Sequence, residues 1–351
     1  MADQPADQPA DQPAAQPAAL EGVLRILQIN EAHICGHMLQ LAAELGIADL
    51  LAAGPRDAAG LAADTGSDPD ALHRLLRFLA GQGIFTEDDA GRFSLTPTGD
   101  CLRSDHPQSL LDLLRWSTVV SRTFQDARYS LRTGLPAFPE AFGQPLFEYL
   151  RDHPEVGGHF NGAMAGFSRL ESAAVTGAYD FSGARVVVDV AGGDGTLLAD
   201  LLKAHPAAEG VLMEQPHVVE GAARRFEAEG LSARCRVVSG DFFDEIPASG
   251  DLYILKSIIH DWADDDALRI LTACRRAMAP GSRLLLIESV VPPGNTPGEA
   301  KLRDVVMLTL LGGRERTREE YAQLLGKAGL RLGQVVATRS PLQILEALPS
   351  D

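Results

Sequence analysis

The second half of the chain alternates short apolar runs with helical stretches, and this pattern constrains the fold more than any other feature. From Ala184 onward the runs are RVVVDV, GVLME, CRVVSG, DLYILK and RLLLIES, with a closing pair at LGQVVATR and LQILEAL. Buried strands that alternate with helices are typical of a parallel sheet with right-handed crossovers. The sequence therefore predicts a Rossmann-like, doubly wound α/β fold with a mostly parallel sheet over residues 181–351.

The N-terminal region divides into a repetitive tail and an apolar helical part. Residues 1–18 repeat the motif ADQP and offer no apolar face to bury, which predicts a disordered tail. Over residues 20–51 the apolar residues recur at helical spacing, and Gly46 fits a helix end. We therefore expect a helical domain over residues 19–105.

Residues 60–99 follow the order helix, turn, helix and hairpin, which is a winged-helix pattern. Asp68 is placed to cap the second helix, and Asp89 to Gly91 are placed to turn the hairpin. A winged helix raises the question of DNA binding. The acidic and basic side chains of the presumed second helix cancel, however, and no basic stripe forms. We expect this domain to pack or dimerise rather than to read DNA.

The net charge and the hydropathy of the chain argue against two classes of partner, nucleic acids and membranes. Its net charge is −17, which repels nucleic acid phosphates and anionic lipid. No apolar run approaches the roughly 20 residues needed to span a bilayer. We therefore expect no nucleic acid and no membrane partner, and we expect the apolar helices of the N-terminal domain to build a homodimer.

Residues 106–180 are mostly helical in pattern and connect the two regions. The stretch HFNGAMAGFSRLESAAV is rich in aromatic and methionine side chains, among them Phe160, Met164 and Phe167. This pattern fits a helix that faces a core as well as it fits the wall of a substrate pocket. The residues alone do not choose between the two.

Polar or flexible groups follow four successive predicted strands. A glycine turn, in VVVDVAGGDGTLL, follows the first strand, and Glu214 ends the second. Asp241 and Phe242 follow the third, and Lys256 ends the fourth with His260 just beyond. Open α/β sheets bind ligands at the carboxyl ends of their strands, where an acid after the second strand suits a ribose diol. Four such endings favour an adenosyl ligand.

A dinucleotide is the rival ligand for this turn. Gly192, Gly193 and Gly195 do not have the spacing of GxGxxG, and Asp194 at the start of the next helix would repel a pyrophosphate. A ligand with a positive charge and no phosphate fits better. A glycine turn with a purely structural purpose stays open as the alternative.

Five motifs together give the chain a specific resemblance to a known family. They are VVVDVAGGDGT, GDFFDEIP, LKSIIHDWADDDALRIL, RLLLIES and GGRERTREEYAQLLGKAGL. Over residues 20–348 the chain resembles class I S-adenosylmethionine-dependent O-methyltransferases. This group includes plant caffeic acid and flavonoid O-methyltransferases and bacterial O-methyltransferases of antibiotic biosynthesis. The resemblance implies S-adenosyl-L-methionine as the cofactor, and we expect no metal.

The resemblance also implies roles for individual residues of the cofactor site. The glycine-rich loop of the family falls on Asp189 to Gly195, with Ala191 where glycine is usual. This difference matters only if the residue takes a positive φ. The implied cofactor-binding residues are Asp189, Gly192, Glu214 for the ribose, Asp241 and Phe242 for the adenine, and Lys256.

The catalytic base of the family falls on His260, and two acids that flank it fall on Glu288 and Glu315. Neutral imidazole, with a pKa of about 6.5, can accept the proton of a phenol, with a pKa of about 10, when the oxygen is held beside the sulfonium. Either acid would orient the imidazole. We expect Asp264 to Asp266 to cap the following helix. The implied pocket residues are Met164, Phe167, Met307 and Leu311.

We therefore expect O-methylation of a phenolic or hydroquinone hydroxyl on a small aromatic acceptor of secondary metabolism. One alternative is a relative that binds the same cofactor but hydroxylates or decarboxylates, and another is a winged-helix regulator. The presence of His260 and both acids favours methyl transfer. The chain shows no signal-peptide pattern, and its four cysteines lack metal-ligand spacing, so we expect a cytoplasmic protein with reduced thiols.

Overall fold

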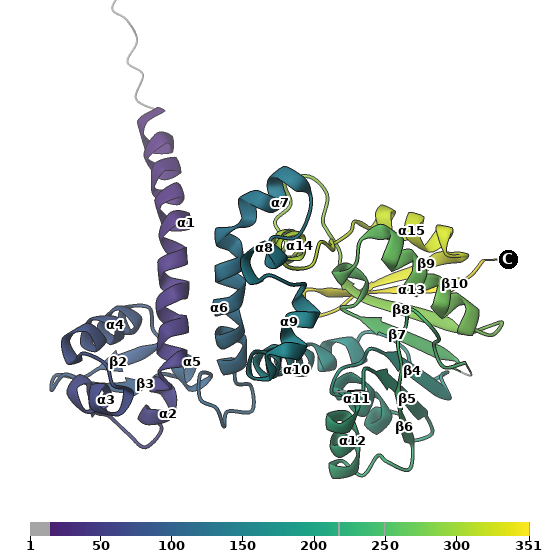
Figure 1. Ribbon diagram of the computed structural model, residues 1–351, viewed down its shortest axis with the longest axis horizontal. Helices are drawn as coiled ribbons and strands as arrows, with labels where there is room; N and C mark the ends of the chain where they lie inside the picture. The colour runs from purple at the N-terminus through teal and green to yellow at the C-terminus, as the bar shows by residue number, and fades with distance from the viewer. Residues whose placement is uncertain (1–14, 217, 249, 351) are drawn as a thin grey trace, which may run out of the picture. The chain divides into compact units, whose positions relative to one another are not determined.

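The computed structural model describes residues 15–350 apart from 217 and 249, and it divides into two compact units. The first unit ends at His106, and the second begins at Pro107 (Figure 1). Residues 106–180 were expected to form a region of their own, but from Pro107 onward they belong to the same compact unit as the sheet that follows them. Residues 1–14, most of the expected tail, lie outside the described residues.

Helices and a small three-stranded sheet make up the first unit. Its elements are α1 (Ala15–Glu44), α2 (Ile47–Leu51), β1 (Arg56–Asp57), α3 (Ala58–Thr65), α4 (Pro69–Gly81), β2 (Phe85–Glu87), β3 (Arg92–Leu95) and α5 (Pro97–Asp100). The strands pair antiparallel in the order β1-β3-β2. Leu61, Leu76, Leu79, Phe85 and Phe93 are buried in the core between α3, α4 and the hairpin. The order of helix, helix and hairpin is the one expected from the sequence.

The backbone confirms three local predictions for this unit. Gly46, just past the end of α1, has a φ of 66°, and Gly91 in the hairpin turn has a φ of 72°. Asp68 precedes α4 and accepts a hydrogen bond from the amide of Ala71 at 2.9 Å. Glycine and a capping aspartate favour these conformations. The start of α1 differs from the prediction, because the helix begins at Ala15, inside the segment expected to be a disordered tail.

Much of α1 carries apolar side chains that remain exposed. Each of the following is at least 46% exposed: Leu20, Val23, Leu24, Ile26, Leu27, Ile29 and Ile34. Single exposed apolar residues are ordinary, but a run of them along one element is typical of an interface with another chain.

The second unit is built around a seven-stranded sheet. Its strands are β4 (Val186–Val190), β5 (Glu209–Glu214), β6 (Cys235–Ser239), β7 (Leu252–Lys256), β8 (Arg283–Ser289), β9 (Leu330–Ala337) and β10 (Leu342–Pro349). They lie in the order β6-β5-β4-β7-β8-β10-β9. The first five strands of that order run parallel, whereas β10 pairs antiparallel with β8 and with β9. The predicted mostly parallel sheet is confirmed.

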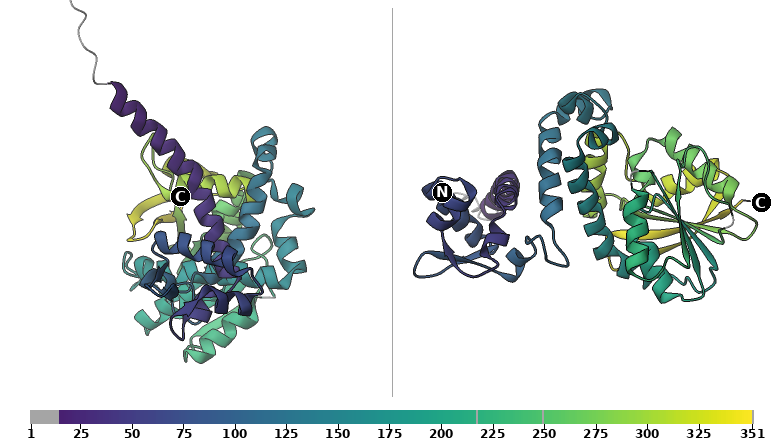
Figure 2. Two further views of the ribbon diagram at one scale, coloured as in Figure 1. Left: turned by 90° about the vertical axis from the view of Figure 1, so that its left-hand side faces the viewer. Right: turned by 60° about the horizontal axis from the view of Figure 1, so that its bottom comes forward.

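Helices cover both faces of this sheet, as a doubly wound fold requires (Figures 1 and 2). The helices are α11 (Thr196–Ala204), α12 (Val219–Ala228), α13 (Asp264–Ala277) and α15 (Arg318–Lys327). Leu252 and Ile254 of β7 belong to the apolar cluster of α11 and α12, while Tyr253 and Leu255 belong to that of α13 and α15. Because both faces of each strand are covered, the strands read as continuous apolar runs rather than alternating ones.

A helical layer precedes the sheet in the chain and packs with one later helix. Its helices are α6 (Leu111–Gln125), α7 (Ala127–Thr133), α8 (Phe138–Phe142), α9 (Leu146–Asp152) and α10 (Pro154–Thr176), and the later helix is α14 (Glu299–Leu310). Trp116, Phe138, Leu146, Ala163 and Leu310 form an apolar cluster that joins α6, α8, α9 and α10 to α14. The layer thus packs helices that precede the sheet in the chain against a helix that lies between β8 and β9.

The four cysteines are free thiols, as expected. Burial raises the pKa of both Cys235 and Cys274 to about 12, so these two stay protonated. Across the part of the chain that the structure describes, none of the helices combines the length and the apolar character needed to cross a membrane.

We predict that Asp68→Ala destabilises α4 by about 1 kcal/mol, because it removes the cap on the Ala71 amide. Asp68→Asn is the matched control, since asparagine caps a helix about as well as aspartate. Hydrogen exchange of the α4 amides should quicken about fivefold in the alanine variant and stay near the wild-type rate in the control. Equal exchange rates in all three proteins would contradict the prediction.

Candidate active site

The turn after β4 brings backbone close to a buried carboxylate. Gly193 and Gly195 have φ values of 61° and 77°. A Cβ on Gly192 would lie 2.4 Å from an oxygen of Asp189, so this position has no room for a side chain. Ala191 has a φ of 57°, which means that alanine stands at a left-handed position where the family has glycine. The difference from the family at Ala191 therefore matters, because the residue does take a positive φ.

Backbone strain falls at the ends of two neighbouring strands. Among the described residues, Ala191 after β4 and Ser257 after β7 are the two non-glycine residues with positive φ. An alanine or serine in this region costs roughly 1–2 kcal/mol. Such strain is common at functional sites, because the surrounding fold holds the chain in a conformation that it would not choose alone.

The predicted cofactor residues of β5 and β6 line one hollow with the glycine turn. Its walls are Ala191, Met213, Glu214, Gln215, Gly240, Asp241 and Phe242. The carboxylate of Glu214 accepts hydrogen bonds from the amides of Gly193 at 3.0 Å and Gln215 at 2.8 Å. The side chain of Asp241 is exposed and accepts from the amide of Phe243 at 2.8 Å. Glu214, Asp241 and Phe242 thus share one concave surface.

Asp189 is buried beneath this turn, and neither of its carboxylate oxygens has a hydrogen-bond partner among the described residues. Burial raises its pKa to about 7, and the charge of Lys256 opposes that rise. A buried carboxyl group without a partner is costly. Its position therefore suits a ligand that donates hydrogen bonds or carries positive charge.

Lys256, the predicted cofactor contact at the end of β7, is paired within the protein. Its ammonium group lies 2.8 Å from the buried carboxylate of Glu171 and 3.2 Å from the hydroxyl of Ser168, both on α10. Glu171 also lies 3.6 Å from the guanidinium of Arg303 on α14. Sequence reasoning missed Glu171, since an acid in the middle of an amphipathic helix gives no signal of burial.

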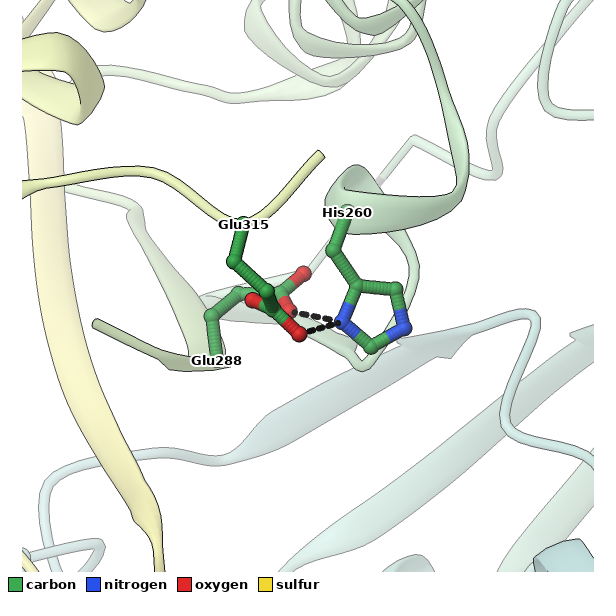
Figure 3. Close-up of side chains that lie close together, drawn as sticks. All are labelled: His260, Glu288 and Glu315. Atoms are coloured by element: carbon green, nitrogen blue, oxygen red, sulfur yellow. Dashed lines mark ion pairs between the residues drawn. The ribbon is translucent and has the colours of Figure 1, made fainter. Parts of the chain in front are cut away.

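The structure brings the three predicted catalytic residues together from distant segments (Figure 3). His260 lies in a short 3-10 turn, η1 (Ile259–Asp261), beyond β7. Glu288 comes from the end of β8, and Glu315 from the loop before α15. Nδ1 of His260 lies 3.1 Å from Oε2 of Glu288 and 3.1 Å from Oε1 of Glu315. Both carboxylates are fully buried, so the pair of acids faces one side of the imidazole.

A third acid, Asp261, lies at the other ring nitrogen, with Oδ1 3.3 Å from Nε2 of His260. Burial alone would lower the pKa of His260, but the charges of Glu288 and Asp261 outweigh it and hold this pKa well above the ordinary value. Burial raises the pKa of Asp261 and of Glu315, and the charge of His260 counteracts both rises. The cluster therefore binds a proton tightly. Sequence reasoning missed Asp261, although its place beside His260 was a signal.

Glu288 contacts both the imidazole and the backbone that carries it. Its second oxygen, Oε1, accepts hydrogen bonds from the amides of Ile258 at 3.1 Å and Ile259 at 2.8 Å. The sequence predicted that Glu288 would act only on the imidazole. That prediction was incomplete, because one carboxylate fixes the turn and the ring together.

The acidic run after His260 has a different role from the one predicted. Ala263 precedes α13, and no side chain caps this helix. Asp264 instead accepts hydrogen bonds from the buried guanidinium of Arg316, at 2.8 and 3.1 Å. The cap prediction is therefore wrong, although three acids in the first helical turn still suit the helix dipole. Arg316 stands in the GGRERT motif, and its burial was not foreseen.

The four predicted pocket residues lie on α10 and α14 or at the end of α14. Met164 of α10 is 37% exposed, and Phe167 of the same helix lies under the guanidinium of Arg303 at 5.7 Å. Met307 is half-buried on α14, and Leu311 ends that helix and packs against the apolar cluster of the helical layer.

Trp262, two positions after His260, packs against aromatic side chains from two other segments, and the sequence did not predict these contacts. Its ring lies edge-on to Phe242 at 5.9 Å and parallel to Phe147 of α9 at 6.3 Å. Phe147 contacts Phe160 of α10 edge-on at 6.4 Å. Aromatic side chains thus form a continuous row from Phe242 in the strand-end hollow, through Trp262, to Phe147 and Phe160 in the helical layer.

His260, Glu288 and Glu315 also form a group of donor atoms that could hold a cation, since one atom from each lies within 4.8 Å of the others. One imidazole nitrogen and two carboxylates are donor types that several divalent metals accept. The ion pairs within the group account for the same placement without a metal.

Comparison with known proteins gives the same assignment over nearly the whole chain. A family described as the O-methyltransferase domain matches residues 124–331, and one described as the O-methyltransferase dimerisation domain matches residues 16–105. The chain is 42% identical over 325 residues to the phenazine O-methyltransferase PhzM of Lysobacter antibioticus, covering 92% of this chain and 95% of that protein. It is 37% identical to the aclacinomycin 10-hydroxylase RdmB of Streptomyces purpurascens, covering 84% and 80%.

The fold matches that of NcsB1, an O-methyltransferase from neocarzinostatin biosynthesis solved with S-adenosylmethionine and 2-hydroxy-5-methyl naphthoic acid. The TM-score is 0.80 at 36% identity, and the match covers 90% of this chain and 96% of NcsB1. The order of the sheet, the hollow at its strand ends and the two matched domains all point to the same family. The chain belongs to the family of S-adenosylmethionine-dependent O-methyltransferases, with an N-terminal dimerisation domain.

Proposed function

We propose that the protein methylates a phenolic or hydroquinone oxygen of a small aromatic acceptor, with His260 as the general base. One observation carries this proposal: the imidazole lies just beyond a buried strand, 3.1 Å from each of two buried carboxylates. The names of relatives support the acceptor class, because one methylates a phenazine and another was solved with a naphthoic acid. The row of aromatic side chains around Trp262 suits a planar acceptor.

The residues of the strand-end hollow fit the cofactor. Gly192 leaves room at the backbone, and Asp189 offers a buried carboxyl group that lacks a partner among the described residues. Glu214 would hold the ribose hydroxyls, Asp241 the adenine amine and Phe242 the adenine face. When bound, S-adenosylmethionine supplies an electrophilic methyl group on a sulfonium.

The proposed part of Lys256 is indirect. Because its ammonium group is paired with Glu171 at 2.8 Å, it would act on the cofactor site through its charge on Asp189. The same ion pair fixes α10, which bears two proposed pocket residues, Met164 and Phe167, to the strand that leads to His260. Met307 and Leu311, on the adjoining α14 segment, would complete the pocket.

The arrangement around His260 assigns a task to each ring nitrogen. Carboxylates accept hydrogen bonds but do not donate them, so Nδ1, which faces Glu288 and Glu315, keeps its proton. Nε2 is then the nitrogen that takes the phenolic proton. Asp261, 3.3 Å from Nε2, stabilises the imidazolium that results. The residues of the strand-end hollow would hold S-adenosylmethionine with its methyl group in line with the acceptor oxygen, so that the new C–O bond could form as the C–S bond breaks and the thioether leaves. Holding both reactants in place would lower the barrier to this transfer.

We predict that His260→Ala keeps cofactor affinity but lowers methyl transfer about 100- to 10,000-fold, the usual contribution of a positioned base. Calorimetry would measure the affinity, and transfer of a labelled methyl group to a phenol of pKa about 10 would measure the rate. The loss should shrink as the pH approaches the pKa of the acceptor, because phenoxide in solution needs no base.

Two controls accompany this variant. His73→Ala, which changes a histidine of the first unit, should keep the wild-type rate, and so should wild-type protein treated with a chelator, since we expect no metal. Wild-type turnover by His260→Ala at pH 7 would show that His260 is not the base.

We predict that kcat/KM rises with pH and levels off above a midpoint higher than 6.5, because the base must lose a proton whose pKa is raised by Glu288 and Asp261. Glu288→Gln removes one of these charges, so the midpoint should move to lower pH. Glutamine keeps an oxygen for the amides of Ile258 and Ile259, which limits damage to the turn. A midpoint that is the same in both proteins would exclude this origin of the pH dependence.

We predict a homodimer formed through α1, because its apolar side chains are exposed and the matched dimerisation domain covers it. Light scattering should give about twice the 37.4 kDa of one chain. The double variant Leu24→Glu, Leu27→Glu should shift the mass toward one chain at micromolar concentration, since it places charge in the interface. Glu31→Lys on the same helix is the control. A wild-type monomer at this concentration would contradict the prediction.

A second candidate function is hydroxylation, because the relative RdmB is named a 10-hydroxylase. The proposed function and this alternative differ in their products. A labelled methyl group recovered on the acceptor oxygen supports methyl transfer, whereas an acceptor that gains oxygen, or loses carbon dioxide, with the cofactor unchanged supports the alternative.

A further inference from the structure

Arg316 is the largest fully buried side chain in the described residues, with 1% of its surface exposed. Its five N–H donors are all engaged. Nη1 donates to the carbonyls of Ile259 at 3.0 Å and Arg314 at 3.2 Å, and Nη2 donates to the carbonyl of Trp262 at 2.9 Å. Nε and Nη2 both donate to Asp264. A guanidinium with every donor used is held in one orientation.

The two carbonyls from η1 and its end bracket the base. Ile259 precedes His260 directly, and Trp262 follows it by two positions, so the guanidinium holds the turn on both sides of the histidine. The backbone reinforces this contact, because the amide of Arg314 donates to the carbonyl of His260 at 2.8 Å. The segment 313–316 therefore lies directly against the turn.

Gly313 allows this close approach. A Cβ at Gly313 would lie 2.1 Å from the carbonyl oxygen of His260 and 2.6 Å from that of Asp261. Real Cβ atoms do not come this close to backbone, so any other residue would push the two segments apart. The glycine is needed for space, since its φ is not among the positive ones.

The segment 313–316 also connects to the two acids that face Nδ1 of His260, Glu288 and Glu315. Glu315 lies between Arg314 and Arg316, both of which bond to the turn. The backbone of Arg316 pairs with the end of β8, where the amide of Val291 donates to its carbonyl at 3.0 Å. Since Glu288 lies on β8, Arg316 connects the segments that carry His260, Glu288 and Glu315.

We propose that Arg316 is a positioning residue that fixes the turn bearing His260 against Glu288 and Glu315. This inference rests on the proposed role of His260 as the base. It assigns to Arg316 no contact with acceptor or cofactor. Its action goes through the backbone carbonyls of Ile259 and Trp262, and a misplacement of about 1 Å in such a group can cost about 100-fold in rate.

Arg316→Lys is the sharpest test, because lysine keeps the charge but has three donors on one flexible atom and cannot reach both carbonyls and Asp264 together. We expect kcat to fall about 10- to 100-fold, with KM for the acceptor and affinity for S-adenosylmethionine within about threefold of wild type. Arg318→Lys, two positions away and exposed, is the matched control and should keep the wild-type rate.

A second readout does not need turnover. In the protein without cofactor, the titration of His260 followed by NMR should move toward the ordinary value in Arg316→Lys, because the ring loses its place between the carboxylates. This measurement separates the two proposals: if His260 proved not to be the base, its titration would still report whether Arg316 positions it.

Two further variants keep the test decisive if Arg316→Lys does not fold. Gly313→Ala leaves every charge in place and should produce the same fall in kcat by pushing the turn away. Asp264→Ala removes the acceptor of two of the guanidinium bonds and should cost less, since the carbonyl contacts remain. The proposal would be overturned if Arg316→Lys kept both the kcat and the His260 titration of the wild type. The same result in both Gly313→Ala and Asp264→Ala would overturn it too. A lowered kcat with an unchanged His260 titration would also overturn it.

Discussion

The rest of the site depends on the contacts of the Glu288 carboxylate with the turn that bears His260 and with the imidazole. One oxygen accepts the two amides at the start of the His260 turn, and the other lies 3.1 Å from the imidazole. Because Glu288 is on β8, an interior strand of the sheet between β7 and β10, the turn and the ring take their positions from the sheet itself. A carboxylate with no exposed surface is tolerable only because these contacts replace the water that it loses.

The other buried charges follow from that placement. Glu315 adds a second acid on the same side of the ring, and Asp261 adds a third at Nε2, so the imidazole is well suited to hold a proton. Arg316 brings the compensating positive charge and fixes the turn by its carbonyls. Taking one member away from such a network leaves the others buried without a partner, which is why buried ion pairs are sensitive to single substitutions.

The strand β7 links this cluster to the predicted cofactor residue Asp189. It ends in Lys256, whose charge acts on Asp189 beneath the glycine turn, and it leads within a few residues to His260. The ion pair between Lys256 and Glu171 attaches α10 to the same strand. Lys256, the turn that bears His260 and, through the ion pair, α10 are therefore all attached to β7. Under the proposed function, this arrangement favours a fixed distance between the two reactants.

Much of this could be predicted from the sequence, because the signals are local. Apolar runs between helical stretches predicted the parallel sheet, and a glycine turn with strand-end side chains predicted residues that line one hollow. Family motifs pointed to His260, Glu288 and Glu315, which the structure brings together. One local signal was misinterpreted, namely the acidic run after His260. It was expected to cap α13, whereas Asp264 pairs with Arg316 instead.

The sequence by itself determined the order of the elements and which strand ends carry polar groups, since periodicity and turn chemistry act between near neighbours. Only the tertiary structure decided which charges compensate one another: Glu171 with Lys256, Arg316 with the turn and Asp264, and both oxygens of Glu288. The physical reason is that the cost of burying a charge depends on partners from distant segments, and these partners are set by how the helices and strands pack.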